Sequence, residues 1–489
     1  MQIYSERFEQ NPAIKYFGHL AFLLMTIFAA VFYLERMIFV DPSFITFTLL
    51  DEGDYAVQVY RFGVVLTQSV PLLFHHCGAS LKTILLAYSL TFPLLYWLIY
   101  TILVHLLRAE RAGMALLLIF SLMACNSFYW IIAEYHQGMA FLVLFWVWMH
   151  RSFARENYGW LEWVGQALLL IVILFFHPVI LFPTLFAMGF LFFDLKDKKQ
   201  VKFWALVAFT LVVFAVKNVY FSNPYDSGKI AGAIKSLISF ISGQDWRYLK
   251  QFLKDCTYDY LFFVLGFLAM LVFYIKQRKF GKMLWMVALV SSYVAIIIFS
   301  IGQDAQKIYV DGMLFAAGFM VALPLLYDLL PVLGTTRKLA PALILGLLLA
   351  IRLPIIIVAH QPMTERLHWI ADLVDTMRAH PESNRFFIHK EDLPMDKLFF
   401  EWGLCYETLL YSSLESPDSA CVAIAIPVHA VSVEQAAQIV EQNVSNVIYC
   451  PWWGMPYDKP SFRRYFNMGE KPYRMLKIKS SDQSQKSKD

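Results

Sequence analysis

The chain has 489 residues, of which 59% are hydrophobic and only 16% are charged, and its formal net charge is +4. A soluble domain carries about 25% charged residues, so this composition excludes an ordinary soluble protein and favours a polytopic membrane protein. The sequence has no basic tract with interleaved aromatic residues, so we expect no nucleic-acid partner.

The apolar runs predict about eleven membrane-spanning helices. They lie at roughly residues 17–40, 82–107, 112–132, 137–149, 161–176, 178–193, 201–221, 259–275, 283–301, 310–330 and 339–358. The first run follows a polar stretch without a cleavage-site pattern, so we expect a retained anchor. Lys and Arg side chains gather in alternate short loops, such as 196–202 and 276–282. This pattern places the N-terminus in the cytoplasm and the C-terminus outside.

Some of these runs are too short to cross a membrane alone. The stretch 161–193 is interrupted at His177-Pro178, where proline removes a backbone donor and disfavours helix in the preceding residue. Each half has about 15 residues and rises about 22 Å, less than a hydrocarbon core of about 30 Å. We therefore expect a hairpin that leaves a recess at the outer surface, and the short run 137–149 suggests a second shallow hairpin.

After about residue 360 the sequence changes character. RFFIHK (385–390) and ACVAIAIP (420–427) predict short buried strands, and VIYC (447–450) a third. DKLFFEWGLCYETLLYSS and SVEQAAQIVEQ predict helices. The expected fold is an α-helical polytopic membrane protein with a small C-terminal α/β domain outside the membrane. Its predicted parts are a transmembrane domain over 1–360 with outer loops 41–81 and 222–258, the α/β domain over 361–478, and a disordered tail over 479–489.

The first outer loop has the densest negative charge. Its stretch LLDEGDYAVQVYRFG (49–63) places Asp51, Glu52 and Asp54 within four residues, and if it is helical, Asp54 and Arg61 share one face. One interpretation is a solvated helix whose acidic first turn favours the helix dipole. The other is a carboxylate over the recess that acts as a general base, or a cluster, with Asp51 and Asp54 as ligands, that holds Mg²⁺ or Mn²⁺.

Other ionisable side chains lie near the predicted outer ends of the spans. Glu134 and His136 are functional if their turn lies at membrane depth, and ordinary surface residues if it protrudes. His177 at the hairpin apex either binds substrate or satisfies carbonyls that Pro178 frees. The stretch KIAGAIKSLISFIS predicts an interfacial amphipathic helix. The cations able to bind an anionic substrate are Arg61, Lys217, Lys229, Lys307 and Arg352, the last of which alternatively reaches lipid headgroups.

Together these features resemble the GT-C superfamily of membrane glycosyltransferases, which take a sugar from a polyprenyl-phosphate or polyprenyl-diphosphate carrier. The resemblance rests on the acidic first outer loop, the interfacial helix, the short paired helices and the small outer domain. It implies that Asp51, Glu52 or Asp54 is the general base or a metal ligand, and that one of the cations Lys217, Lys229, Lys307 and Arg352 holds the carrier phosphate. The WWD-type motif of oligosaccharyltransferases is missing, since CPWWGMPYD (450–458) has its aspartate later.

The resemblance implies an inverting transferase in the bacterial inner membrane that acts on its outer face. Its partners are then membrane lipid, a polyprenyl-phosphate-linked sugar and a lipid, glycan or protein acceptor. A transporter or flippase of a lipid-linked or amphipathic solute also fits broken helices, although the halves show no repeat and the polar groups cluster on one face. A non-catalytic scaffold is the third alternative. Acidic side chains of the first outer loop that point into bulk solvent would contradict the proposed base.

Overall fold

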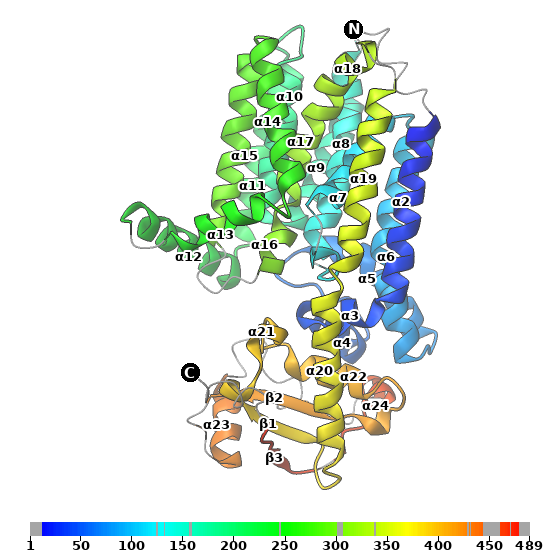
Figure 1. Ribbon diagram of the computed structural model, residues 1–489, viewed down its shortest axis with the longest axis vertical. Helices are drawn as coiled ribbons and strands as arrows, with labels where there is room; N and C mark the ends of the chain where they lie inside the picture. The colour runs from blue at the N-terminus through cyan, green and yellow to red at the C-terminus, as the bar shows by residue number, and fades with distance from the viewer. Residues whose placement is uncertain are drawn as a thin grey trace.

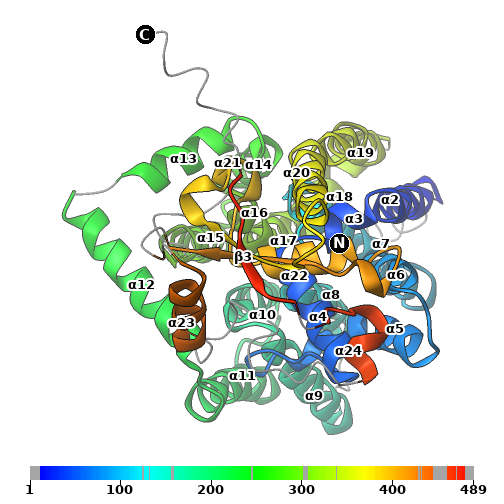
Figure 2. The ribbon, with the colours of Figure 1, turned by 90° about the horizontal axis from the view of Figure 1, so that it is seen from below.

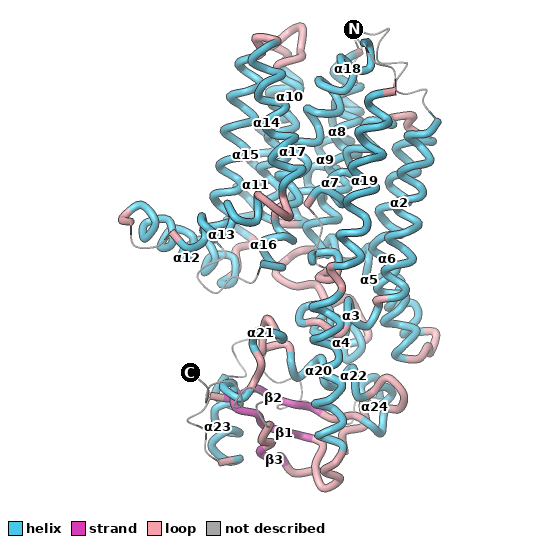
Figure 3. Tube along the Cα trace, viewed as in Figure 1, coloured by secondary structure: helices cyan, strands magenta, loops and turns pink. Residues whose placement is uncertain are grey.

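The computed structural model describes residues 12–123, 126–131, 133–155, 159–243, 246–300, 307–336, 339–427, 430, 432–443, 460–469 and 471–478. It consists of a helical bundle and a smaller C-terminal part that lies at one end of the bundle (Figure 1). We call the bundle end that faces this part the domain-side end, and the opposite end the far end. Figure 3 shows that the strands are confined to the C-terminal part.

The bundle is built from helices with few charged side chains. The helices that run along it are α2 (Pro12–Val31), α6 (Leu81–Thr101), α7 (Glu110–Leu122), α8 (Ala133–Ala154), α9 (Trp160–Phe176), α10 (Leu181–Phe192), α11 (Val201–Tyr220), α14 (Leu261–Lys276), α15 (Phe280–Ser300), α17 (Phe315–Pro324) and α19 (Ala340–Val358). Within the described residues, five helices are long and apolar enough to span a membrane, or up to six if one bent pair counts as a span. The chain is therefore a helical membrane protein, but these lengths do not establish eleven spans.

The hairpin predicted at His177-Pro178 is confirmed. α9 ends at Phe176, His177 is extended (φ −160°, ψ 143°), and a single 3-10 turn, Pro178–Ile180, leads into α10. The prediction of a second shallow hairpin is wrong, because the run 137–149 lies within α8, which is one helix of 22 residues. Polar side chains in its first turn are buried and bonded inside the protein, so the helix begins before the apolar run.

The segment after the first helix crosses the domain-side end. It contains α3 (Tyr33–Met37), α4 (Val40–Glu52) and α5 (Val65–His76). The helix expected over DYAVQVYRFG is wrong. α4 stops at Gly53, which is left-handed (φ 67°), and Val59 and Tyr60 also have positive φ values of 45° and 60°. Such backbone cannot continue a right-handed helix, so Asp54 and Arg61 share no helix face.

Two further helices, α12 (Pro224–Ile241) and α13 (Arg247–Cys256), lie at the rim of the domain-side end (Figure 1, Figure 2). α12 covers the stretch predicted as an amphipathic helix, and Ile234, Leu237, Ile238 and Ile241 on it are exposed. The helix is thus confirmed, while its place at a membrane surface stays a prediction.

α20 (Gln361–Arg378) carries the chain out of the bundle, two residues after the end of α19. It leads to a parallel sheet of order β2-β1-β3, in which Arg385 pairs with Val422 and with Tyr473. The strands are β1 (Arg385–His389), β2 (Val422–Ile426) and β3 (Tyr473–Met475), and the helices around them are α21 (Met395–Leu398), α22 (Leu404–Ser412), α23 (Val433–Asn443) and α24 (Pro460–Tyr465). β1 and β2 were predicted and β3 was not. The strand expected at 447–450 lies outside the described residues.

Aromatic side chains join the C-terminal part to the bundle. The Tyr406 ring of α22 lies 5.2 Å from the Phe44 ring and 5.4 Å from the Phe47 ring, both on α4. The Phe466 ring, just after α24, lies 6.0 Å from Phe47. The two parts therefore share one apolar core at α4.

A buried ion cluster closes the far end of the bundle. Lys282 Nζ lies 2.7 Å from Asp194 Oδ2 and 2.9 Å from Asp328 Oδ2, and Tyr274 donates to Asp328 at 2.8 Å. Asp328 belongs to a π-helical turn, Leu325–Leu329, which turns its side chain toward this cluster. Four separate segments are thereby tied together around one lysine.

Candidate functional site

Charged side chains from three segments of the bundle meet at the domain-side end. Arg61 lies at the centre, with its guanidinium 3.2 Å from Glu134 Oε1 on α8 and 3.0 Å from Asp226 Oδ1 on α12. The side chains of Arg61 and Glu134 are each 10% exposed. Asn223 caps α12 and donates to the other oxygen of Asp226 at 2.8 Å. Charge-assisted bonds of this kind hold their members in one geometry.

Asp41 belongs to the same group of charges. It is the second residue of α4, outside the spanning helices, and its Oδ2 accepts a hydrogen bond from Trp130 Nε1 at 3.0 Å. Burial, and then the negative charge of Glu134, raise the pKa of Asp41 to about 6, against the opposing effects of Trp130, Arg61 and Lys229. A carboxylate with such a pKa is mostly ionised at neutral pH and still basic enough to accept a proton.

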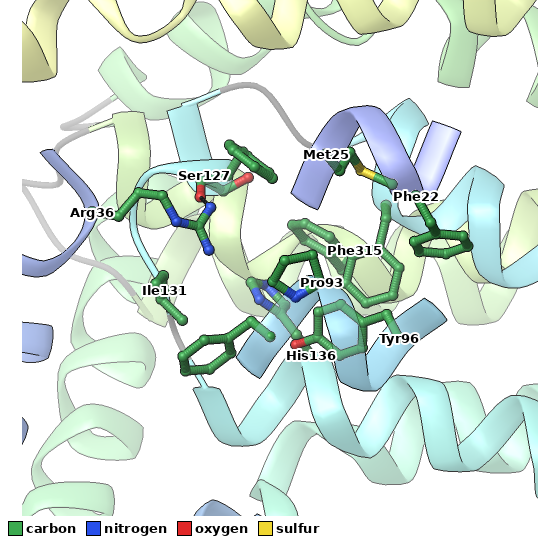
Figure 4. Close-up of a pocket in the computed structure, with 12 residues that line it drawn as sticks. Phe22, Met25, Arg36, Pro93, Tyr96, Ser127, Ile131, His136 and Phe315 are labelled. Atoms are coloured by element: carbon green, nitrogen blue, oxygen red, sulfur yellow. Dashed lines mark hydrogen bonds between the residues drawn. The ribbon is translucent and has the colours of Figure 1, made fainter. Parts of the chain in front are cut away.

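A small cavity lies between α2, α6, α7, α8 and α17 (Figure 4), and one of its lining residues is His136, two residues after Glu134 on α8. Arg36 of α3 lines it and is 2% exposed. Its Nε donates to Ser89 Oγ at 2.9 Å, a terminal nitrogen donates to the Phe128 carbonyl, and its Cζ lies 4.3 Å from the Phe128 ring centre. Within the described part of the chain, no carboxylate pairs with this guanidinium. The cavity therefore has an unbalanced positive charge at its edge.

The cavity also has polar groups whose bonding is incomplete. The hydroxyls of Tyr96 and Ser127 are buried and have no hydrogen-bond partner among the residues that the structure describes. His136 lines the cavity as well, with Nε2 3.0 Å from the Gly312 carbonyl. The volume is about 40 Å³, enough for one or a few water molecules. Binding a larger group here requires the walls to move apart.

The structure does not bring the three predicted carboxylates to this site. Asp51 lies about 15 Å from Asp41 along the axis of α4, and Ser461 Oγ of α24 donates to its backbone carbonyl at 2.9 Å. Glu52 and Asp54 are exposed, and Asp54 Oδ1 accepts from the backbone N–H of Tyr55 at 2.7 Å. Glu52 and Asp54 face solvent, so the expectation that all three carboxylates overlook a recess is not met. The residues that line the cavity include none of the three, and do not include Asp41 either. The described residues also contain no group of three His, Cys, Asp or Glu side chains able to hold a metal ion.

Two of the predicted cations bond to backbone carbonyls. Lys217 is buried, donates to Leu174 O at 2.6 Å, and lies close enough to Arg61 and Asp226 to interact with their charges. Arg352 is buried and donates to Ser121 O at 2.6 Å and to Asp259 O at 3.0 Å. Both cations thus serve the packing of the bundle, and the structure brings neither to Asp41.

The remaining candidates are placed as follows. Lys229 of α12 is half-buried and close enough to Asp41 to lower its pKa. His177 is buried, its Nδ1 accepts from the N–H of Val179 at 3.4 Å, and its ring stands edge-on to Tyr135. The side chain of Lys307 lies outside the described residues. His177 and Lys217 both lie within range of the Arg61 charge. The members of the predicted set at or beside the site are therefore Arg61, Glu134, His136, His177, Lys217 and Lys229.

Sequence reasoning missed Asp41, Arg36 and Trp130. Asp41 lies in the stretch VDPSF, which contains no second acidic residue, so no cluster of acidic residues identified it as a candidate. Arg36 fell inside the predicted span 17–40, where an arginine is costly and is a functional candidate by default. That signal was available from the sequence, whereas the pairing of Trp130 with Asp41 joins residues 89 positions apart.

Comparisons of the chain with protein-family models, with curated proteins and with solved structures find no match. Function is therefore inferred from the site itself.

Proposed function

We propose that the chain is a membrane glycosyltransferase of the GT-C type, which moves a sugar from a polyprenyl-phosphate carrier to an acceptor hydroxyl at the domain-side end. The observation that supports this most is that Asp41 meets the Glu134–Arg61 pair, while His136, two residues after Glu134 on α8, lines the same cavity as Arg36. We take the domain-side end as extracytoplasmic, because the lysine-rich loops 196–202 and 276–282 gather at the far end (Figure 1).

Asp41 is the general base in this proposal, in place of Asp51, Glu52 or Asp54. Its carboxylate takes the proton of the acceptor hydroxyl, and the hydroxyl oxygen attacks the anomeric carbon of the sugar. The bond from that carbon to the phosphate oxygen breaks, and the carrier phosphate leaves with the electron pair. Attack from the side opposite the leaving group inverts the anomeric carbon.

Arg36 is the cation proposed to hold the carrier phosphate. Its guanidinium has five N–H donors, and its partners in the structure are hydroxyl and carbonyl groups. A phosphate that replaced water beside it would gain charge-assisted bonds, and the hydroxyls of Tyr96 and Ser127 could donate to the same group. The apolar lining of the cavity suits the chain next to the phosphate.

The donor must widen this space when it binds. Ligand pockets commonly measure about 300–1,000 Å³, whereas the cavity measures about 40 Å³. The ion pair of Arg61 and Asp226 joins the non-helical segment 53–61 to the rim helix α12. We propose that α12 moves away from Arg61 when the donor enters.

The test is sugar transfer by the purified protein in lipid nanodiscs. The donors are polyprenyl-phosphate mannose and polyprenyl-phosphate glucose, with a lipid and glycan extract as acceptor, and released polyprenyl phosphate is measured by mass spectrometry. We expect Asp41→Asn to lower the rate about 100-fold or more, while Asp54→Asn, the same change at an exposed carboxylate, leaves it unchanged. Equal rates for wild type and Asp41→Asn would remove Asp41 as the base. No release from either donor by folded wild-type protein would contradict the donor class.

A further inference from the structure

The start of α4, which carries Asp41, is held by the C-terminal part. Val40 is the first residue of α4, so its N–H has no acceptor within the helix. It donates to Glu407 Oε1 of α22 at 2.6 Å. Glu407 is fully buried. A residue 367 positions away along the chain therefore fixes the amide next to Asp41.

Arg366 of α20 holds Glu407 and the preceding turn together. It is buried, and one terminal nitrogen forms an ion pair with Glu407. The other terminal nitrogen donates to Ile38 O at 3.0 Å, and Nε donates to Leu398 O at 3.1 Å. One guanidinium thus ties the residues before α4 to two segments of the C-terminal part.

Trp130 makes a second connection to Asp41. The same indole whose N–H binds Asp41 lies 5.9 Å from the Phe39 ring and 5.7 Å from the Phe400 ring of the C-terminal part. Phe399, which also faces Phe39, has a positive φ of 64°. Such a backbone conformation is unfavourable for a residue with a side chain and persists only where packing enforces it.

The contact between α22 and α4 is too close for a larger residue. A Cβ atom at Gly403 would lie 2.7 Å from Val40 Cα and 3.1 Å from Glu407 Oε1. Gly403 therefore lets the two helix starts approach closely enough for the Val40–Glu407 bond. An alanine there would have to push α22 away from α4.

We propose that Glu407, together with Arg366, is a positioning residue for Asp41, so that the C-terminal part completes the catalytic site. The catalytic consequence rests on the proposed function. Two sets of contacts are independent of the proposed function. One runs from Glu407 through Val40 to Asp41, and the other from Phe400 through Trp130 to Asp41.

Three variants separate this role from general stability. Glu407→Gln keeps an oxygen that can accept from Val40, Glu407→Leu removes it, and Gly403→Ala disturbs the same contact by one methyl group. Lys282→Met is the matched control, because it breaks a buried ion pair at the far end of the bundle. Gly403→Ala keeps the test decisive if Glu407→Leu does not fold.

The first measurement needs no sugar transfer. A water-soluble carbodiimide labels protonated Asp41, and mass spectrometry at a series of pH values gives the midpoint of labelling. We expect a midpoint near pH 6 in wild type and Glu407→Gln, since the pKa of Asp41 is about 6. In Glu407→Leu and Gly403→Ala the midpoint should fall toward the ordinary value of 3.8, because Asp41 moves into water. The charges that face it, on Glu134, Arg61 and Lys229, are the same in every variant.

The second measurement is transfer per folded molecule at pH 7. We expect kcat to fall about 10-fold or more in Glu407→Leu and Gly403→Ala with little change in KM for the donor, since a displaced base slows only the chemical step. Glu407→Gln should retain most of the rate, and Lys282→Met should keep both the rate and the midpoint. A wild-type midpoint and rate in both disruptive variants would overturn the proposal, as would the same losses in Lys282→Met. If the midpoint shifts as expected but wild type transfers no sugar, the proposed function fails and the positioning of Asp41 stands.

Discussion

Lys217 donates to the carbonyl oxygen of Leu174 at 2.6 Å, and this is the oxygen that Pro178 leaves without a helical donor. In an α-helix the N–H of residue i+4 bonds to the carbonyl of residue i. Residue 178 lies four positions after Leu174 and is a proline, which has no N–H. The ammonium group from α11 therefore replaces the missing donor and fixes the apex of the α9–α10 hairpin.

Lys217→Met should destabilise the protein. Removing the ammonium leaves the carbonyl of Leu174 buried and unpaired, at a cost of about 1–3 kcal/mol. Thermal unfolding in detergent should show a lower midpoint than in wild type. Lys199→Met, at an exposed lysine beyond the other end of α10, is the control. If both variants unfold with wild type, Lys217 has no such role.

The raised pKa of Asp41 means that its charged form destabilises the folded protein. The pKa rises from 3.8 to about 6 on folding, so the folded state binds the proton more tightly. The contribution of Asp41 to the free energy of unfolding is therefore full below pH 4 and is lost as the pH rises through 6. Asp41→Asn should be more stable than wild type above pH 6, by up to about 3 kcal/mol, and equal to it below pH 4. Denaturant unfolding at pH 3.5, 5 and 7.5 measures this, and a constant difference across the three would contradict it.

Arg61 and Glu134 should be strongly coupled. Arg61→Met leaves Glu134 without its cation in a largely buried place and should cost about 3–5 kcal/mol. Glu134→Leu should cost less, because Arg61 keeps its ion pair with Asp226. The double variant should cost less than the two single losses together, because the carboxylate that Arg61→Met strands is absent. Unfolding of the four proteins gives the coupling energy. Additive losses would show that the pair, at 3.2 Å, does not hold the site together.

Opposite ends of the bundle should react with reagents on opposite sides of the membrane. Lys198 is exposed in the loop between α10 and α11, and Asp396 is exposed on α21 of the C-terminal part. In a background in which Cys77, Cys125, Cys256 and Cys450 are replaced by serine, an impermeant maleimide added outside should label Asp396→Cys and spare Lys198→Cys. A permeant maleimide should label both. Labelling of Lys198→Cys from outside would reverse or refute the proposed orientation.

Features with local causes were predictable from the sequence. Pro178 removes a helix donor and disfavours helix at His177, and the break lies where the sequence places it. β1 and β2 are buried and rich in apolar residues, so their sequence runs identify them. β3 spans only Tyr473–Met475 and owes its existence to pairing with Arg385–Phe387, which no local pattern encodes.

The site was predictable only in part, because tertiary contacts decide it. Three acidic residues within four positions drew attention to Asp51, yet two of the three face solvent and the third lies under α24. The hydrogen bond of Asp41 comes from Trp130, and its pKa depends on the charges of Glu134 and Lys229; all three residues belong to distant segments. The backbone turn at Val59 and Tyr60, which carries Arg61 to Glu134, also has no clear sequence signal.

The cluster around Lys282 has a consequence for the rival idea of a carrier. A protein that opens alternately to both sides of a bilayer must part its helices at the far end in every cycle. Here that step would separate the buried pair of Lys282 and Asp328, whose atoms lie 2.9 Å apart, and would also break the contact of Lys282 with the exposed Asp194 at 2.7 Å. The proposed transferase, in contrast, can keep these bonds throughout its reaction.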